Sequence, residues 1–418
     1  MNMRHPIEIG ILFGITVLVA ACQQKTGKTT ENQQDSMKVS YEKGSFGYDL
    51  DFLNKYDSVI LLQNESGLGQ IIVSAKYQAK VFTSTANGAE GKSFGWVNYK
   101  AFDAAIDPHM NAYGGEDRLW LGPEGGPFSL YFKKDTEMVF ENWKTPAAID
   151  TEAWDLVAAD SKEVNMEKRS VITNYKGTPL DIKLQRKVRI LENAEVEKEL
   201  GISLSPGLKS VAFTTQNTIS NVGSAAWTKE TGAPCLWNLD MFNPSDSTVI
   251  LIPYQENASG KVATTDYFGE IPTDRIVYKQ GVLFFKADGK SRGKLGLTAQ
   301  RAKQIAGSYD LESGVLTITK YSLDPSKTYL NQEWTTKKDP FVGDAVNAYN
   351  DGPLADGGQM GPFYEIESVS PAAFLKPNES LTHQHAVYHF MGAKTEINQL
   401  IKSLFQIEIN DIRTAFKN

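Results

Sequence analysis

The amino-acid sequence predicts an all-β protein whose antiparallel strands form a sandwich or a barrel. From residue 58 to about residue 390, short runs alternate between apolar and polar side chains at every second position. Glycine, asparagine, aspartate and proline separate these runs, and no helical pattern is interleaved with them, which is typical of all-β folds. The predicted strands include residues 59–62, 70–76, 79–85, 128–132, 170–174, 180–190, 208–219, 248–254, 275–285, 315–321 and 363–369.

The first 21 residues have the parts of an export signal. Arg4 supplies positive charge, residues 7–21 are apolar apart from Glu8, Thr16 and glycines, and small residues stand directly before Cys22. This pattern resembles a lipobox, so we expect lipidation of Cys22 and attachment to a membrane. A membrane-spanning helix is the alternative, but the apolar run is shorter than the ~20 residues that a span requires.

Residues 22–45 are predicted to be a flexible tether, because residues 23–38 are polar and almost free of large apolar side chains. Gln23 follows the cysteine where lipoproteins retained at the inner membrane carry aspartate, so we expect a lipid-anchored cell-envelope protein. The predicted location is the outer membrane, facing the periplasm. No break in composition divides the rest, so residues 46–418 are predicted to be one domain.

The overall charge and the cysteine count narrow the function. The formal net charge is −7 and no basic cluster stands out, which argues against nucleic acid as a partner. Once Cys22 is lipidated, Cys235 remains alone, so no intrachain disulfide is expected. Burial of apolar surface must then hold the fold together.

The C-terminal tail is the exception to the β pattern. Its apolar residues recur at helical spacing, and they are Ile397, Leu400, Ile401, Leu404, Phe405, Ile412 and Phe416. We therefore expect one helix over residues 394–416, with its apolar side packed on the sandwich.

Residues 109–126 form the first of three stretches rich in functional residue types. His109, Glu116, Arg118 and Trp120 offer an imidazole, a carboxylate, a guanidinium and an aromatic face among glycines. Such groups suit a sugar, because polar groups satisfy paired hydroxyls and a ring covers the apolar side of the sugar. The structural alternative is a glycine-shaped corner in which Arg118 pairs with Glu116 or Glu124.

Residues 343–353 form the second stretch, and they contain the oxygen-donor residues Asp344 and Asn350. These residue types occur in calcium loops, but their spacing does not match the EF-hand pattern. The final Asn-Asp-Gly-Pro is a turn signal in its own right. Turn chemistry is therefore the first interpretation here, sugar contacts the second and calcium the third.

The third stretch runs from residue 361 to residue 390. Strand alternation places Glu365 and Glu367 on one face of a strand, and it places His383, His385 and His389 together on one face of the next. Carboxylates and imidazoles are the usual general bases and acids. The alternative is hydrogen-bonded histidines at the rim of the core. A divalent metal at His383 and His385, or at residues 344–351, is possible but not favoured, so no cofactor is predicted.

With these residues in view, the chain resembles the galactose mutarotase-like superfamily, and within it a set of Bacteroidetes lipoproteins. The resemblance rests on residues 114–124, 343–353 and 361–371, and it extends from about residue 55 to residue 392. It implies an all-β antiparallel supersandwich with a sugar bound across a concave face. It also implies a carboxylate base on a late strand, a position that Glu367 or Glu365 matches. Mutarotases carry earlier histidines, whereas residues 110–382 contain none.

Three functions are compatible with these patterns. The first is a sugar-active enzyme of the epimerase type, with Glu367 as base, His383 or His385 as acid and Arg118 holding ring hydroxyls. For this enzyme, Arg118, Glu367 and at least one of the histidines at 109, 383 and 385 should converge on one groove. The second is a non-catalytic glycan-capturing lipoprotein that stacks sugars on Trp96, Trp120 or Trp237. The third is a structural envelope protein. The sequence identifies no protein partner.

Overall fold

The structure, a computed structural model, describes residues 39–354 and 357–417. The predicted export signal and Cys22 lie outside the described residues. The compact unit begins at Tyr41, a few residues before the expected end of the tether. Ser45 caps the first helix, α1 (Phe46–Leu53). The backbone oxygen of Gly44 accepts a hydrogen bond from the amide of Ser93. Among the described residues, no helix is long and apolar enough to cross a membrane.

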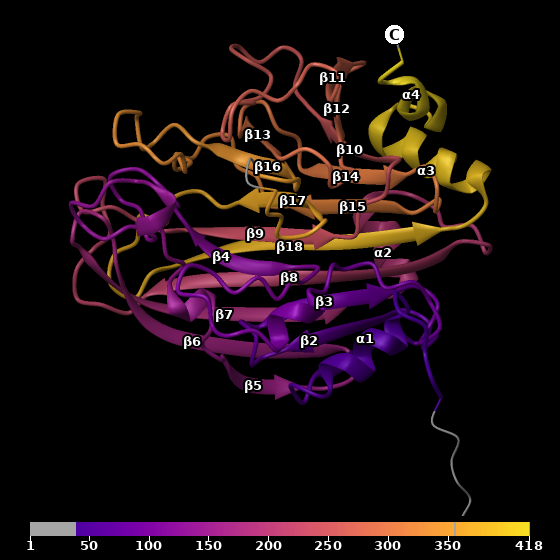
Figure 1. The fold of residues 1–418 in the computed structure, drawn as a ribbon, viewed down its shortest axis with the longest axis horizontal. Coiled ribbons are helices and arrows are strands. Elements are labelled where there is room, and N and C mark those ends of the chain that lie inside the picture. Colours follow the sequence, from indigo (N-terminus) through magenta and orange to yellow (C-terminus); the bar gives the residue numbers. More distant parts are fainter. Residues whose placement is uncertain (1–38, 355–356, 418) are drawn as a thin grey trace, which may run out of the picture. The chain divides into compact units, whose positions relative to one another are not determined.

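The predicted all-β antiparallel fold is confirmed. The described strands form a ten-stranded sheet in the order β11-β12-β10-β14-β15-β18-β8-β7-β6-β5, a five-stranded sheet in the order β13-β16-β17-β9-β4, and the three-stranded sheet β1-β2-β3. Figure 1 shows how these strands are arranged. Their bounds are β1 Ile60–Gln63, β2 Gln70–Ser74, β3 Lys80–Thr85, β4 Arg118–Gly122, β5 Asp155–Ala159, β6 Glu163–Thr173, β7 Pro179–Ile190, β8 Lys209–Asn221, β9 Cys235–Phe242, β10 Thr248–Pro253, β11 Ile276–Lys279, β12 Val282–Lys286, β13 Gly293–Thr298, β14 Ile305–Asp310, β15 Leu316–Tyr321, β16 Asp344–Asn350, β17 Tyr364–Val369 and β18 Ser380–Met391.

The five-stranded sheet stacks on the ten-stranded sheet, and the main core fills the space between them. Side chains of β9 and β17 reach across this space to β18 and β14: Asp240 contacts His385, Ser368 contacts His383, and Tyr364 contacts Ser308. Because side chains alternate along a strand, the residues between these on β9 and β17 point to the opposite face of the five-stranded sheet. That opposite face carries the candidate site.

The other face of the ten-stranded sheet is partly covered by helices. A second apolar cluster joins residues of β10, β12, β14, β15 and β18 to α2 (Asn193–Leu200), α3 (Lys394–Phe405) and α4 (Ile409–Thr414). Figure 1 shows α3 and α4 side by side, in yellow, next to β10, β14 and β15. The N-terminal helix α1 (Phe46–Leu53) instead packs on β2 and β3, where Phe46 and Leu53 meet Ile72 and Phe82.

The predicted single helix over residues 394–416 is corrected to two short helices. Gln406 ends α3 in the left-handed conformation, with φ of 60°. Glu408 then starts α4 with a capping box that includes Asp411. On either side of this break, Phe405 and Ile412 are both buried in the apolar cluster against the sheet.

Several local predictions are also corrected. Residues 128–132 form no strand, and residues 275–285 are not one strand but the hairpin of β11 and β12. Residues 344–350, interpreted first as a turn, form β16 inside the five-stranded sheet. The helices α1 and α2 were not anticipated, because each has only eight residues and too few turns to show a clear period.

Candidate functional site

A pocket of about 310 Å³ lies on the face of the five-stranded sheet that points away from the ten-stranded sheet. The strand register explains which side chains form its floor. Lys294 on β13 pairs with Tyr349 on β16, and Tyr349 pairs with Glu365 on β17. At the other edge of the sheet β4 pairs with β9, and there Arg118 and Trp120 lie opposite residues of β9. Five strands therefore contribute to one floor, and residues 118 and 365 meet although they are far apart in the chain.

Two buried ion pairs cross this floor. The guanidinium Nη2 of Arg118 lies 2.6 Å from Oε1 of Glu365, and Nζ of Lys294 lies 3.0 Å from Oε2 of Glu367. The same Glu367 oxygen accepts a hydrogen bond of 2.9 Å from the indole nitrogen of Trp237. Glu365 lines the pocket, whereas Glu367 is fully buried beneath it. A ligand therefore meets the first carboxylate directly, while the second one holds Lys294 and Trp237 in place.

Burial shifts the proton affinity of these groups. Burial raises the pKa of Glu365 to about 8, against the lowering effect of Arg118 and with a further rise from Glu367. Burial also raises the pKa of Glu124, which reaches the pocket from the loop after β4. Burial alone would lower the pKa of Lys294, but the carboxylates around it outweigh this effect and raise the pKa. The floor therefore combines a firmly charged ammonium with the Glu365 carboxyl, which holds a proton near neutral pH, and with Glu124, whose pKa is also raised.

Aromatic rings form the walls and part of the floor of the pocket. Trp120 and Trp237 meet edge to face, with ring centroids 5.7 Å apart. On one wall, Trp143 stacks on Trp334 with centroids 6.0 Å apart and on Phe140 with centroids 6.1 Å apart. Phe140 is 57% exposed, so it offers a ring to solvent at the rim of the pocket.

His109 also belongs to this wall. Its ring stacks on that of Phe140, with centroids 4.7 Å apart and planes inclined by 12°. Its Nδ1 lies 2.7 Å from the backbone oxygen of Trp143. Because a carbonyl only accepts hydrogen bonds, Nδ1 is the protonated nitrogen and Nε2 remains available. Of the three residues expected to converge on one groove, Arg118 and His109 line this pocket, whereas Glu367 lies beneath it.

The structure does not bring His383 and His385 to the pocket, and the expected pairing of Glu367 with either of them is corrected. Both imidazoles lie between the two sheets, 0% and 1% exposed. His383 Nε2 and His385 Nδ1 each lie 2.8 Å from the hydroxyl of Ser368. Ser368 is the neighbour of Glu367 on β17, and neighbouring side chains on a strand point to opposite faces. The sheet therefore separates the histidines from the carboxylate.

The buried histidines titrate in opposite directions. Burial and the neighbouring His385 lower the pKa of His383 to about 3, so this ring is neutral. Burial also opposes the charging of His385, but Asp240, 2.7 Å away, outweighs burial and raises the pKa of His385. These groups form a structural network inside the sandwich, which is the alternative that the sequence left open.

Other predicted site residues lie away from the pocket. Glu116 is buried and accepts hydrogen bonds from Ser84 and the ring of His389. Asp344 accepts a hydrogen bond of 2.7 Å from the hydroxyl of Tyr267, and neither residue lines the pocket. The amide of Asn350 holds the backbone of residues 289 and 291, and Trp96 packs in a small cluster with Met241, Tyr349 and Phe363.

The sequence left two positions open for a divalent metal, the histidines at 383 and 385 and the oxygen donors of residues 344–351. Among residues 39–354 and 357–417, no group of three or more histidine, cysteine, aspartate and glutamate side chains is arranged to hold a metal ion. Cys235, the cysteine among these residues, is buried and unpaired.

A family model described as a family of unknown function (DUF6786) matches residues 44–416. The chain belongs to this family. No curated protein matches the sequence.

Solved structures of galactose mutarotase-like proteins are similar in fold to this DUF6786 protein. A putative aldose 1-epimerase from Escherichia coli K12 is 12% identical, with a TM-score of 0.45 over 79% of this chain and 98% of its own. A galactose mutarotase-like protein from Lactobacillus casei is 12% identical, with a TM-score of 0.46 over 79% of this chain and all (100%) of its own. A galactose mutarotase related enzyme from Lactobacillus acidophilus is 8% identical, with a TM-score of 0.45 over 80% and 98%. These similarities concern the fold alone.

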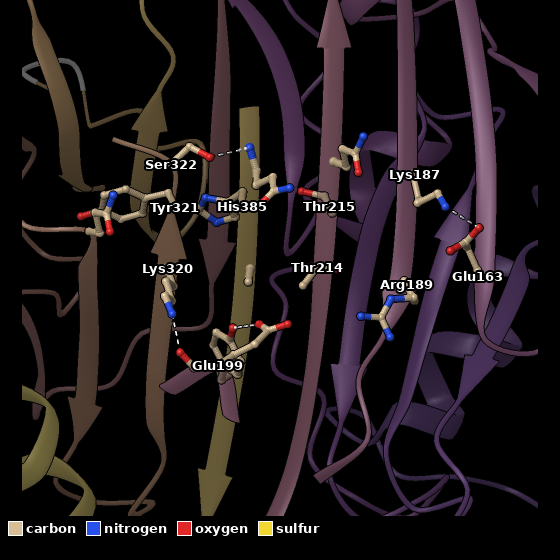
Figure 2. A pocket seen from close by; sticks show the side chains of 15 residues that line it. Glu163, Lys187, Arg189, Glu199, Thr214, Thr215, Lys320, Tyr321, Ser322 and His385 are labelled. Atoms are coloured by element: carbon tan, nitrogen blue, oxygen red, sulfur yellow. Dashed lines mark hydrogen bonds and ion pairs between the residues drawn. The ribbon is translucent and has the colours of Figure 1, made fainter. Parts of the chain in front are cut away.

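The DUF6786 protein has a second, larger pocket of about 570 Å³ on the ten-stranded sheet, and Figure 2 shows its side chains. Its charged groups are already satisfied within the protein: Lys187 pairs with Glu163, and Lys320 donates to the backbone oxygen of Glu199. In the first pocket, by contrast, Nε of Arg118 and the indole nitrogen of Trp120 are buried and have no hydrogen-bond partner among the described residues. Buried polar atoms without partners are a feature of sites that await a ligand, so the first pocket is the better candidate.

Proposed function

We propose that this chain binds a carbohydrate in the pocket on the five-stranded sheet. The observation that supports the proposal is the combination, in one cavity of about 310 Å³, of tryptophan rings with the Arg118–Glu365 pair. A sugar has an apolar side made of C–H groups and a rim of hydroxyls. Aromatic rings cover the first, and planar carboxyl and guanidinium groups pair with the second.

The cavity volume limits the part of the glycan that enters. About 310 Å³ is near the lower end of the range for small-ligand sites. It therefore fits one sugar unit, either a free monosaccharide or the end of a chain. Phe140 and Phe268, 57% and 42% exposed at the rim, offer surfaces for a neighbouring unit.

The two carboxylates of β17 have different parts in this proposal. Glu365 reaches the ligand, since it lines the cavity and is held at one oxygen by Arg118. Glu367 is a positioning residue, since it orients Lys294 and the indole of Trp237 from below. The sequence assigned the base first to Glu367, but of the two carboxyl groups on this face of β17 it is Glu365 that lines the cavity.

Binding can be tested by titrating the purified chain with a panel of neutral and acidic monosaccharides and following tryptophan fluorescence and heat. We expect saturable binding that Phe268→Ala weakens, because the rim loses a ring surface. Tyr278→Ala is the matched control, since Tyr278 is also 42% exposed but does not line the pocket. If no sugar in the panel binds, or if both variants weaken binding equally, the pocket is not the sugar site.

The raised pKa of Glu365 supports a second candidate function, proton-transfer catalysis on the bound sugar. With a pKa of about 8, this carboxyl carries a proton at neutral pH and can donate it to a ring oxygen. As the bond from the anomeric carbon to that oxygen breaks, Glu124 accepts the proton of the anomeric hydroxyl, and the open-chain aldehyde forms. Reclosure on the other face completes anomerisation.

Catalysis and binding are separated by following interconversion of sugar anomers by NMR. If Glu365 is the acid, Glu365→Gln should slow the enzymatic rate by about 10²–10⁴-fold, which is typical for loss of a general acid. Binding of the sugar should persist, because the amide still accepts a hydrogen bond from Arg118. Wild-type protein that binds sugars and leaves their anomerisation rate unchanged is a binding protein only.

For location, we propose that the chain is held at the cell envelope by a lipid on Cys22, facing the periplasm. This part of the proposal rests on residues 1–22 of the sequence, where an apolar segment and small residues precede the cysteine. Labelling cells with a radioactive or clickable fatty acid and isolating the protein from separated membranes tests it.

A further inference from the structure

The pocket contains three cationic side chains, and one of them pairs with no carboxyl group of the described residues. Arg118 pairs with Glu365, and Lys294 pairs with Glu367. Arg292, which also lines the pocket, makes no ion pair with any described residue. An exposed arginine is commonplace, so what matters is whether this one is held in a fixed position.

Two contacts fix the guanidinium of Arg292. It lies over the ring of Phe268, with Cζ 3.9 Å from the ring centroid. Its Nε donates a hydrogen bond of 3.3 Å to the hydroxyl of Tyr349, and that hydroxyl donates in turn to Asp351 at 3.0 Å. The contacts occupy one face and one nitrogen of the group. The edge formed by Nη1 and Nη2 makes no hydrogen bond with any residue that the structure describes.

The backbone before Arg292 is held as well. Asn350 accepts a hydrogen bond from the amide of Gly289 and donates one to the backbone oxygen of Ser291, both at 2.9 Å. The loop therefore cannot carry Arg292 away without breaking these bonds. The guanidinium is therefore held at one face and at Nε, and its Nη1 and Nη2 atoms are positioned to donate two parallel hydrogen bonds to a planar acceptor such as a carboxylate.

We propose that the sugar taken by this pocket is acidic and that its carboxylate binds to the free edge of Arg292. The inference rests on the proposed function, because it names the class of sugar for the same site. A hexuronic acid, free or at the end of a chain, combines a ring of suitable size with a planar carboxylate. Arginine pairs with carboxylates through two parallel hydrogen bonds, which the single point charge of lysine does not reproduce.

Other charges in the pocket are consistent with an anionic ligand. Glu124 and Glu365 also line it, but burial raises the pKa of each, so both are less charged than ordinary carboxylates. Asp107 is exposed at the rim, where solvent screens it, and its carboxylate accepts from the amide of His109. With Lys294 below and Arg292 at the side, positive charge prevails where the ligand enters.

The test is calorimetric titration of the full chain with D-galacturonate and D-glucuronate against D-galactose and D-glucose. We expect the matching uronate to bind at least tenfold more tightly than its neutral counterpart. Arg292→Gln should reduce this preference to under threefold. Arg292→Lys should recover only part of the preference, because lysine keeps the positive charge but lacks the planar pair of N–H donors.

Lys290→Ala is the matched control. It removes one positive charge from the same loop, but Lys290 pairs with Asp246 and does not line the pocket. This variant should keep the full preference for the uronate. If Lys290→Ala loses the preference as Arg292→Gln does, the positive charge of the loop rather than the guanidinium of Arg292 is responsible, and the inference is overturned.

The remaining outcomes separate this inference from the proposed function. Neutral sugars that bind as tightly as uronates overturn the acidic-sugar inference and leave carbohydrate binding intact. Tighter binding of galactose 6-phosphate or 6-sulfate than of galacturonate overturns the choice of a carboxylate. Binding of none of these sugars overturns the proposed function together with the inference.

Discussion

Replacement of Lys294 by methionine is the most direct test of how the floor of the pocket is built. Methionine keeps the length of the stem and removes the ammonium that lies 3.0 Å from Glu367. The side chains of Lys294 and Glu367 are 10% and 0% exposed, so water cannot replace the lost partner. Glu367 would keep only the indole hydrogen bond from Trp237, and its second oxygen, Oε1, already has no partner.

The magnitude follows from the cost of leaving a charge buried and unpaired. Removing one member of a buried ion pair typically costs about 3–5 kcal/mol. Here we expect a loss of about 3 kcal/mol, at the lower end of that range, because Trp237 still donates a hydrogen bond to Glu367. This is a large share of the roughly 5–15 kcal/mol that stabilises a typical domain.

Urea unfolding of four proteins measures the effect: wild type, Lys294→Met, Glu367→Gln and the double variant. The double variant should be more stable than the sum of the single losses predicts, by about 2 kcal/mol, because it leaves no uncompensated charge. Additive losses, or a loss below about 1 kcal/mol for Lys294→Met, would refute the reasoning, since exposed pairs show that range.

Three further predictions concern separate parts of the chain. The pKa of Glu365 is raised from 4.5 to about 8 on folding. Between these pH values the native state binds more protons than the unfolded state, so the contribution of Glu365 to the free energy of unfolding falls as the pH rises toward and through about 8. Glu365→Gln should therefore flatten the dependence of unfolding free energy on pH between 5 and 9, and an unchanged slope contradicts it. Phe405→Ala should cost about 3–5 kcal/mol in urea unfolding, because the ring is 3% exposed between α3 and the sheet. A cost under about 1 kcal/mol would show that the helices contribute little. Cys22→Ser should abolish acylation, and mass spectrometry of the membrane-extracted protein that finds Cys22 unmodified in an intact N-terminus contradicts the lipid anchor.

Strands with one buried face could be predicted from their alternation, and some strands buried on both faces, such as β3 and β10, could be predicted from their apolar runs, but β9 could not. Residues 180–190 alternate cleanly, and the structure has β7 there with alternating burial. All eight residues of β9 are buried, so their pattern shows no period of two. Asn238 and Asp240 are also types that single-residue preferences place in loops. They are accommodated in β9 because Asp117 and His385 are hydrogen-bonded to them.

The candidate pocket could be predicted only in part, for a related reason. Arg118, Trp120 and Glu365 were found because they stand in sequence stretches dense with polar and aromatic residues. Lys294 and Arg292 stand in no such stretch, and they reach the pocket only through the pairing of β13 with β16. Strand order and register are tertiary properties, so no local pattern could have found them.

The histidine strand explains how the pocket face is kept in register. A slip of one residue in strand pairing would move every side chain of a strand to the other face. His385 contacts Asp240 on β9 and Ser368 on β17 in the space between the sheets. These bonds require Asp240 and Ser368 to face inward, so Met241 and Glu367, which follow or precede them, must face outward. The buried histidines therefore act on the pocket indirectly: by fixing the inner residues of two strands, they determine which residues the outer face presents to a ligand.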